Sequence, residues 1–304
     1  MERCGITHRS VRSESGRIPS MSPTIPAPLL GLLFGITSAL IWGSGDFAGG
    51  LASRRYSPFQ VLALVSLTGL ALFLLLAGFT RSGIPPAVDW AWAAGAGVSG
   101  AIGIAALYRG LSLRTAAIVA PTAAVVGTTL PVLAGLLLEG FPGLLPLAGF
   151  LLGGGGIWLV TSALGRQDPE ARHSLGLAVL AGLLFGGFFV LIARVEHDNI
   201  FAPLAIAKGV AVLAAIFILR AKRLPVPTPR VVPLALLAGL FDAGGNVFYL
   251  LSARYSRLDV AAVLSAMAPA VTVLLSALVL SERVDRRQWA GVGLCVLAIV
   301  LLAL

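Results

Sequence analysis

The stretch PLALLAGLFDAGGNVFYLLSA, residues 233–253, decides how the rest of this sequence is interpreted. It is long and apolar enough to cross a bilayer as a helix, yet Asp242 stands near its middle. On a helix, Asn246 lies one turn from Asp242, and Tyr249 lies almost two turns away on the same face. Inserting a carboxylate at membrane depth costs roughly 3 kcal/mol, so this face is expected to meet protein or water. Two interpretations stay open: a polar contact between helices, or a polar stripe along a solute pathway.

The composition of the chain is that of a membrane protein. Of its 304 residues, 58% are hydrophobic and 12% are charged, and the mean hydropathy is +0.95. A soluble domain usually carries about twice that share of charge. The net charge of +9 comes from arginines at the ends of apolar runs, which is typical of membrane anchoring and not of a nucleic-acid partner. We therefore expect a multi-pass protein of the plasma or inner membrane, in contact with the lipid bilayer.

Residues that commonly hold metals or form disulfides are few and scattered. Cys4 lies in the leading tail and Cys295 in the last apolar run, so they predict neither a disulfide framework nor a metal site. His8, His173 and His197 all fall outside the apolar runs. The sequence therefore predicts no metal centre and no cofactor.

Apolar runs near the spanning length recur along the chain with short polar breaks between them. They predict a polar, disordered tail at 1–26, spans at 28–49, 59–79, 90–111, 115–138 and 144–164, a linker at 165–174, and spans at 175–194, 201–219, 231–253, 258–280 and 286–304. This is an all-α membrane protein of ten transmembrane helices, with one five-span unit at 27–164 and another at 175–304. Loop arginines favour a cytoplasmic position for the loops after odd-numbered spans, whereas the arginines of the tail favour the opposite orientation. The side on which the termini lie stays open.

The two sets of five spans resemble each other. A shift of 143 residues places Arg114 on Arg257, and the same shift places Glu139 on Glu282. Because five is odd, the second set must enter the membrane from the opposite side. Inverted repeats of this kind are common in transporters, with the solute site near the midplane between them. The two glutamates are interpreted as structural, paired with Arg283 or with an arginine of a neighbouring loop.

Three features in a fixed order give the halves a specific signature. They are Trp42-Gly43 in the first span, the endings LLEG (137–140) and LSER (280–283), and Pro269 thirteen residues before the second glutamate. With these features the two halves resemble tandem EamA domains of the drug/metabolite transporter superfamily, over residues 29–304. The resemblance implies a fold of ten helices in two inverted EamA repeats. It also implies transport of small organic metabolites, often as export. Because no nucleotide-binding domain accompanies the spans, secondary transport or facilitated diffusion is expected.

Prolines inside the fourth and ninth spans predict kinks. Pro121, Pro131 and Pro269 each lack the N–H that a helix needs, so each frees a backbone carbonyl that is satisfied locally or faces a cavity. The first half departs from the family pattern, because Val126 stands where Pro269 has its counterpart. The resemblance therefore does not fix the geometry of the fourth span.

The motif GSGD at residues 43–46 matches the GxGD signature of one class of intramembrane aspartyl proteases, with Asp242 as the second carboxylate. Such an enzyme needs two carboxyl groups that share a proton. By helix rise, Asp46 lies roughly 5 Å from the end of its span, whereas Asp242 lies about 16 Å from either end of its own. This difference in depth argues against catalysis, although tilt or unwinding absorbs part of it. We expect no enzyme; the protease and a non-transporting structural membrane protein stay as alternatives.

Lys208 is the second charge expected deep inside a span. The seventh and eighth spans run in opposite directions, so Lys208 and Asp242 come within roughly 6 Å of each other in depth. We predict that they form an ion pair or share one solvated site, either as a static salt bridge or as part of a solute pathway. Asp242 is also the best candidate for a group that binds and releases protons.

The candidate substrate-binding or coupling residues are therefore Asp242, Asn246, Tyr249, Lys208, Asp46 and Trp42. The expected partners are a small-molecule solute and, where transport is coupled, protons. The chain is expected to act as a monomer or a homodimer.

Overall fold

The regular structure of this chain is helical throughout the part that the structure describes. The computed structural model describes residues 26–81, 83–112, 116–162, 169–195, 200–225, 227, 233–280 and 286–303. The helices are α1 (Ala27–Ser53), α2 (Pro58–Phe79), α3 (Ala87–Ser112), α4 (Ala116–Leu138), α5 (Leu144–Ser162), α6 (Pro169–Ala193), α7 (Phe201–Ala221), α8 (Pro233–Tyr255), α9 (Leu258–Ser265), α10 (Ala268–Leu280) and α11 (Arg286–Ala303).

Local sequence explains where the helices begin. Pro28 lies in the first turn of α1, where a missing N–H breaks no helical hydrogen bond. α2 begins at Pro58, directly after Ser57, and the Ser57 N–H donates to Gln60 Oε1 at 3.2 Å. Ser57 and Gln60 therefore cap α2 across its first turn.

Six of the described helices are long and apolar enough to cross a bilayer: α1, α2, α3, α6, α7 and α8. Shorter apolar helical segments lie at Thr122–Leu138, Leu144–Gly156 and Leu258–Thr272. Each predicted span overlaps a helix, but the ninth is divided between α9 and α10. These lengths and compositions support a multi-pass membrane protein, and the count of ten spans stays a prediction.

Two predicted segments lie partly outside the described residues. Of the predicted tail, residues 1–25 fall there, and so do residues 165–168 of the predicted linker. The rest of that linker is helical, because α6 begins at Pro169.

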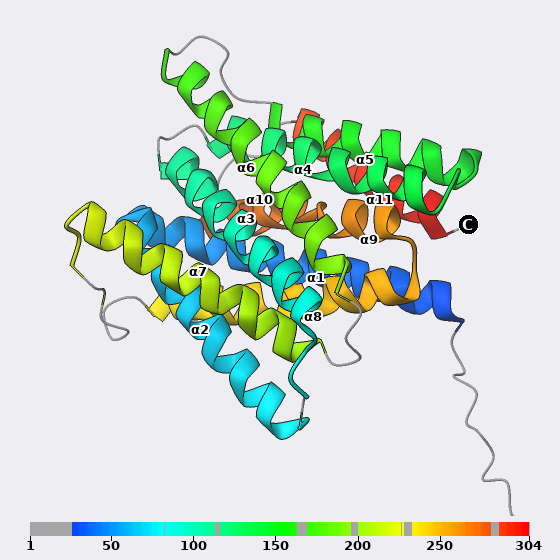
Figure 1. The fold of residues 1–304 in the computed structure, drawn as a ribbon. Helices are drawn as coiled ribbons and strands as arrows, with labels where there is room; N and C mark the ends of the chain where they lie inside the picture. Colours follow the sequence, from blue (N-terminus) through cyan, green and yellow to red (C-terminus); the bar gives the residue numbers. More distant parts are fainter. Residues whose placement is uncertain are drawn as a thin grey trace, which may run out of the picture.

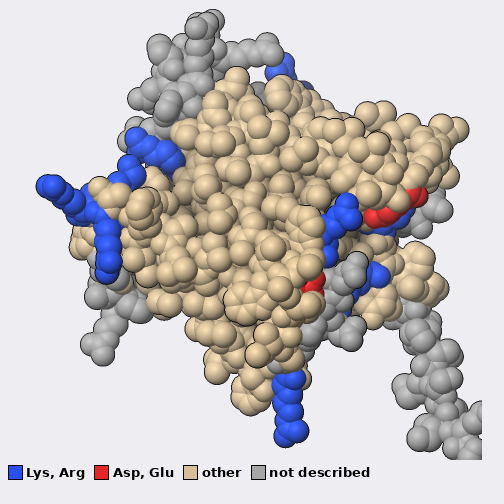
Figure 2. Space-filling model, in the orientation of Figure 1, with Lys and Arg blue, Asp and Glu red and all other residues tan. Residues whose placement is uncertain are grey.

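The surface of the bundle fits a lipid environment. Figure 2 shows a broad uncharged face with Lys and Arg side chains gathered near its margins. Large apolar side chains are exposed, including Phe79 (84%), Leu137 (85%) and Phe217 (73%). A contiguous apolar surface of this extent would promote association in water, whereas in a bilayer it contacts the acyl chains.

The helices of the two halves interlock in a symmetric way. α1 packs most extensively on α8, and α6 packs on α3 in the equivalent arrangement. α2 lies against α7 and α5 against α11, while α4 packs on α6 as α9 and α10 pack on α1 (Figure 1). Exchanging the two halves converts the α1–α8 pair into the α6–α3 pair and leaves the α2–α7 and α5–α11 pairs unchanged. The packing therefore has the pseudo-two-fold symmetry of a repeat protein whose halves share one core.

α1 and α8 lie side by side and run antiparallel (Figure 1). The Ser38 hydroxyl donates to the Gly245 carbonyl at 3.0 Å, and the Ser252 hydroxyl donates to the Gly31 carbonyl at 2.7 Å. Residue numbers thus rise along one helix as they fall along the other. Both bonds are buried, so each serine hydroxyl finds its partner on the other repeat.

The predicted ninth span is interrupted near its middle. α9 ends at Ser265 and α10 begins at Ala268, with a turn at 266–267 between them. Pro269 accounts for the interruption, because it has no N–H to donate to the carbonyl of Ser265 four residues earlier. Pro269 therefore ends one helix and begins another.

The fourth span has a different geometry. α4 is one helix that contains both Pro121 and Pro131, with Val126 at the position that corresponds to Pro269. The departure from the family pattern thus has a structural counterpart: the repeat with proline at this position is interrupted, and the repeat with valine is not.

Candidate functional site

A cavity of about 170 Å³ lies between the two repeats. Its walls come from α1, α3, α4, α6, α7, α8 and the interruption between α9 and α10. The smallest cavity that holds one water molecule has a volume of about 10–15 Å³. This cavity is much larger, so it has room for a small organic molecule. Alanines, glycines and the phenylalanines of α6 make most of the wall apolar, whereas α1, α7 and α8 contribute charged side chains.

The predicted contact between Lys208 and Asp242 is present in this cavity. Lys208 Nζ forms an ion pair with Asp242 Oδ2. The lysine is only 7% exposed, and its aliphatic stem packs on Gly69 of α2. A Cβ at Gly69 would lie 3.3 Å from Lys208 Cδ and Cε, so glycine leaves room for the side chain to reach α8.

Two further candidates hold the backbone of Asp242. Asn246 Nδ2 donates to the Asp242 carbonyl at 2.6 Å, and Trp42 Nε1 donates to the same carbonyl at 3.2 Å. Asn246 Nδ2 also lies 3.4 Å from Asp242 Oδ1. Trp42 can come this close because Gly245 has no side chain. A Cβ at Gly245 would stand 2.4 Å from the Cδ1 atom of Trp42. Trp42 and Asn246 therefore fix Asp242 from two helices, and both line the cavity.

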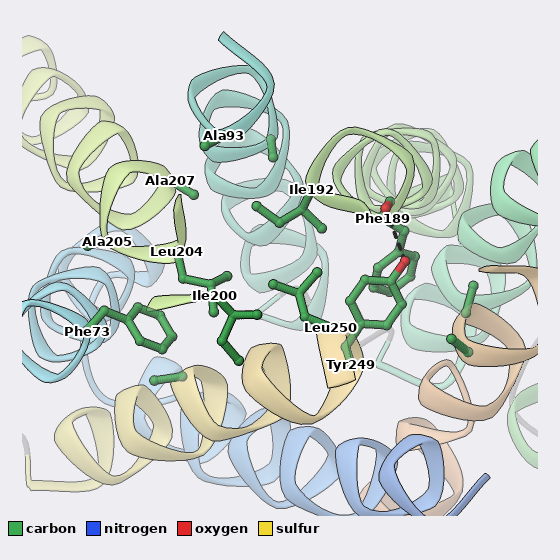
Figure 3. Packing of buried hydrophobic residues seen from close by; sticks show 14 of the residues in the cluster. Phe73, Ala93, Phe189, Ile192, Ile200, Leu204, Ala205, Ala207, Tyr249 and Leu250 are labelled. Carbon is green, nitrogen blue, oxygen red and sulfur yellow. Dashed lines mark hydrogen bonds between the residues drawn. The ribbon is translucent and has the colours of Figure 1, made fainter. Parts of the chain in front are cut away.

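Tyr249 takes a supporting position behind the cavity. It is fully buried, and it is not among the described residues that line the cavity. Its hydroxyl donates to the Phe189 carbonyl at 3.1 Å, as Figure 3 shows. Its ring lies 4.7 Å from that of Phe189 and 5.9 Å from that of Trp42, centroid to centroid. Tyr249 thus positions the aromatic rings of the wall instead of facing the cavity.

The expected separation in depth between Asp46 and Asp242 is wrong. α1 continues to Ser53, so Asp46 is not close to its end. A Cβ at Gly45 would lie only 3.5 Å from the backbone nitrogen of Asp242, which puts this part of α1 level with the middle of α8. Asp46 and Asp242 therefore line the same cavity.

Lining the same cavity does not by itself make Asp46 and Asp242 the carboxyl pair of an aspartyl protease. Within the described part of the chain, no hydrogen bond joins Asp46 to Asp242, whose Oδ2 is occupied by Lys208. The glycines of the GSGD motif serve packing. A Cβ at Gly43 would lie 2.5 Å from the Ala268 carbonyl oxygen, and one at Gly45 would lie 3.1 Å from Phe241 Cβ.

Sequence reasoning missed several residues of the cavity wall. Tyr108 of α3 and Thr272 of α10 both line it, and the Thr272 hydroxyl donates to the Gly43 carbonyl at 2.9 Å. Ser265 also lines it, and counting four residues back from Pro269 would have identified this position. No local signal marks Tyr108, because its place depends on how α3 meets α1.

Arg257 joins the two repeats at one end of α4. Its Nη2 atom donates to the Gly140 carbonyl at 2.8 Å and to Asp259 Oδ2 at 2.8 Å, and its Nε atom lies 3.7 Å from Glu139 Oε2. The backbone N–H of Leu258 donates to Glu139 Oε1 at 3.2 Å. The hydrogen bond to Asp259 raises the pKa of the Arg257 guanidinium further above physiological pH, so the group stays cationic.

The arginine expected to pair with Glu139 is therefore Arg257, from the turn between α8 and α9. Arg114, Glu282 and Arg283 lie outside the described residues. The described residues also contain no group of three or more His, Cys, Asp and Glu side chains that could hold a metal ion.

Comparisons with known proteins identify the family. The model of the EamA-like transporter family matches the chain twice, at residues 29–162 and 174–304. A solved structure described only as the crystal structure of a protein superposes with a TM-score of 0.68, at 23% identity, over 89% of this chain and 95% of its own, which shows a shared fold. The comparison with curated proteins gives no match. With both repeats matched over most of its length, the chain belongs to the EamA-like transporter family.

Proposed function

We propose that this protein is a secondary transporter that exports small organic metabolites across the plasma or inner membrane. The observation that carries the proposal is the cavity between the repeats, with the Lys208–Asp242 ion pair in its wall. A buried ion pair contributes little net stability compared with apolar packing, so its presence at an internal cavity favours a role in binding.

Alternating access is the mechanism that the packing supports. α1 packs with α8 and α3 packs with α6, so each of these tight pairs combines one helix from each repeat. Rocking such pairs against each other opens the cavity to one side and then to the other. The cluster around Arg257 ties α4 to the turn before α9, and opening the cavity at that end requires these contacts to separate.

Proton exchange is the coupling that the site favours. When a solute group binds Lys208, Asp242 loses its counter-ion and can take up a proton. When the solute leaves, Lys208 returns and the proton is released. Asp242 would thus bind protons and solute in alternation, with Lys208 as the group that links the two events.

The alternative functions receive less support. Proteolysis would need Asp46 and Asp242 to share a proton, and Lys208 instead holds Asp242. A purely structural membrane protein has no need of a cavity lined by charged residues.

A solute screen with reconstituted protein tests the proposal. Purified full-length protein in proteoliposomes is offered a panel of small metabolites, with and without an imposed proton gradient. We expect gradient-dependent movement of at least one solute class, absent from protein-free vesicles and reduced at least tenfold in Lys208→Ala. Equal fluxes with and without protein across the panel would contradict transport.

A further inference from the structure

The cavity wall contains one acidic group that the proposed function leaves without a role. Among the described residues that line it, three are charged: Asp46, Lys208 and Asp242. Lys208 and Asp242 neutralise each other as an ion pair. The described part of the chain offers Asp46 neither a hydrogen-bond partner nor an ion-pair partner. Among the described residues of the wall, Asp46 is therefore the acidic group without a counter-charge.

Backbone packing holds Asp46 in place. Gly43 and Gly45, just before it, bring α1 against α10 and α8 so closely that a Cβ at either position would meet neighbouring atoms at 2.5 and 3.1 Å. The helix thus fixes the side chain without polar contacts to its carboxylate. A carboxylate removed from bulk water without a counter-ion is unfavourable, and a cationic ligand would relieve that penalty.

A second unsatisfied acceptor lines the same cavity. The hydroxyl of Ser265 is buried, the residue being 1% exposed, and it has no hydrogen-bond partner among the described residues. The carbonyl of Ser265 also lacks its helical donor, because Pro269 has no N–H. An ammonium group carries up to three donors and no acceptor, which matches a site that presents acceptors.

The part of the cavity wall that α6 forms is apolar, and the relation between the repeats shows how it differs from α1. The shift of 143 residues that relates the halves places Phe189 of α6 at the position of Asp46, and Val65 at the position of Lys208. Phe185, Phe188 and Phe189 all line the cavity. The position in α6 that corresponds to Asp46 thus carries an apolar ring, and Phe185 and Phe188 extend this apolar surface along the cavity wall.

We propose that the cavity selects an amphipathic organic ammonium ion, with its charged nitrogen at Asp46 and its apolar body against the phenylalanines of α6. The inference rests on the proposed transport function and names the substrate class of that site. The aromatic ring of Trp42 adds to the attraction for a cation. An anionic molecule of similar shape would find no cationic partner at Asp46.

Three probes with the same phenethyl body and polar groups of different charge test this selection. Phenethylamine, 2-phenylethanol and 3-phenylpropionate are titrated into the purified full-length protein, and binding is measured by calorimetry. We expect phenethylamine to bind about tenfold more tightly than either of the others, the size expected for a hydrogen bond to a charged group. In Asp46→Asn this preference disappears while the affinity for 2-phenylethanol is unchanged.

Two variants control for folding and for position. Asp46→Glu keeps the charge and is expected to keep the preference. Ser44→Ala removes a polar group two residues away, whose hydroxyl donates to the Leu40 carbonyl within α1, and is expected to bind like wild type. Phenethylamine that fails to bind wild type, equal affinity for all three probes, or an undiminished preference in Asp46→Asn would each overturn the inference.

Uptake into proteoliposomes separates this inference from the proposed function. Movement of neutral or anionic solutes, with no binding of phenethylamine, would contradict the ammonium site and leave transport standing. An Asp46-dependent preference in binding, with no movement of any solute, would contradict transport and leave the site standing.

Discussion

Lys208 of α7 and Asp242 of α8 form an ion pair inside the cavity, where their side chains are only 9% and 16% exposed. Both residues belong to the second repeat, so the pair does not hold the repeats together. Asn246 and Trp42 donate to the backbone carbonyl of Asp242, and Asn246 Nδ2 also lies 3.4 Å from Oδ1, while Oδ2 pairs with Lys208. A static salt bridge and a solute-binding pair would share this geometry, and substitutions separate them.

Exchanging the two charges distinguishes stability from transport. Lys208→Ala leaves a buried carboxylate without its partner, a change that typically destabilises a protein by about 3–5 kcal/mol. The double variant Lys208→Asp/Asp242→Lys restores an ion pair, so its thermal unfolding temperature in detergent should recover most of the loss. Transport should stay abolished, because the solute then meets the charges in reversed positions. A double variant with wild-type transport would show that the pair is only structural.

Replacing Asp242 by asparagine tests its role in proton exchange. Asparagine keeps the size of the side chain but cannot bind and release a proton at neutral pH. We expect gradient-driven accumulation of solute to be lost, whereas solute counterflow, which needs no net proton movement, survives in part. The two fluxes are measured in the same proteoliposome preparation. Undiminished accumulation by Asp242→Asn would remove Asp242 as the coupling group and direct the test to Asp46.

Gly245 is the position at which a single added methyl group should disturb the site. In Gly245→Ala the new Cβ meets the Trp42 ring at 2.4 Å, so the indole must leave its hydrogen bond with the Asp242 carbonyl. Overpacking of this kind costs about 1–3 kcal/mol. The thermal unfolding temperature and the affinity for solute should both fall. Gly209→Ala is the matched control, because its Cβ would have only Leu70 Cδ1 nearby, at 3.9 Å.

Arg257→Lys should weaken the contact between the repeats although it keeps the charge. Lysine cannot reproduce the guanidinium fork that binds Asp259 together with the backbone carbonyls of Glu139 and Gly140. We expect a loss of about 1–3 kcal/mol in unfolding free energy. Arg220→Lys, at an exposed position on α7, should show no comparable shift in unfolding temperature. Equal shifts in the two variants would contradict a specific role for Arg257.

The helices and the ion pair were predictable because each depends on regular spacing, whereas the family was predictable from motifs that recur in both halves. Apolar runs of spanning length locate the helices, and the antiparallel order of neighbouring spans brings Lys208 level with Asp242. The interruption at Pro269 also follows from a local cause, the missing N–H of proline.

The position of Asp46 could not be predicted in the same way. Its depth depends on where α1 ends, and α1 extends past the apolar run to Ser53. Tyr249 has the spacing of a cavity residue, but its hydroxyl turns to the Phe189 carbonyl on α6. Such outcomes depend on how helices from different repeats meet, which the period of a single helix does not encode.

The bond between Ser38 and Gly245 has a consequence for how the protein is made. These residues lie 207 positions apart in the chain. At a synthesis rate of about 5–20 residues per second, Gly245 emerges from the ribosome roughly 10 to 40 seconds after Ser38. During that interval α1 is in the bilayer without α8, and its glycine face, which later packs at Phe241 and Ser256, is open. Assembly of the native bundle is thus a late event in synthesis, and a chain truncated before α8 leaves α1 without its principal partner.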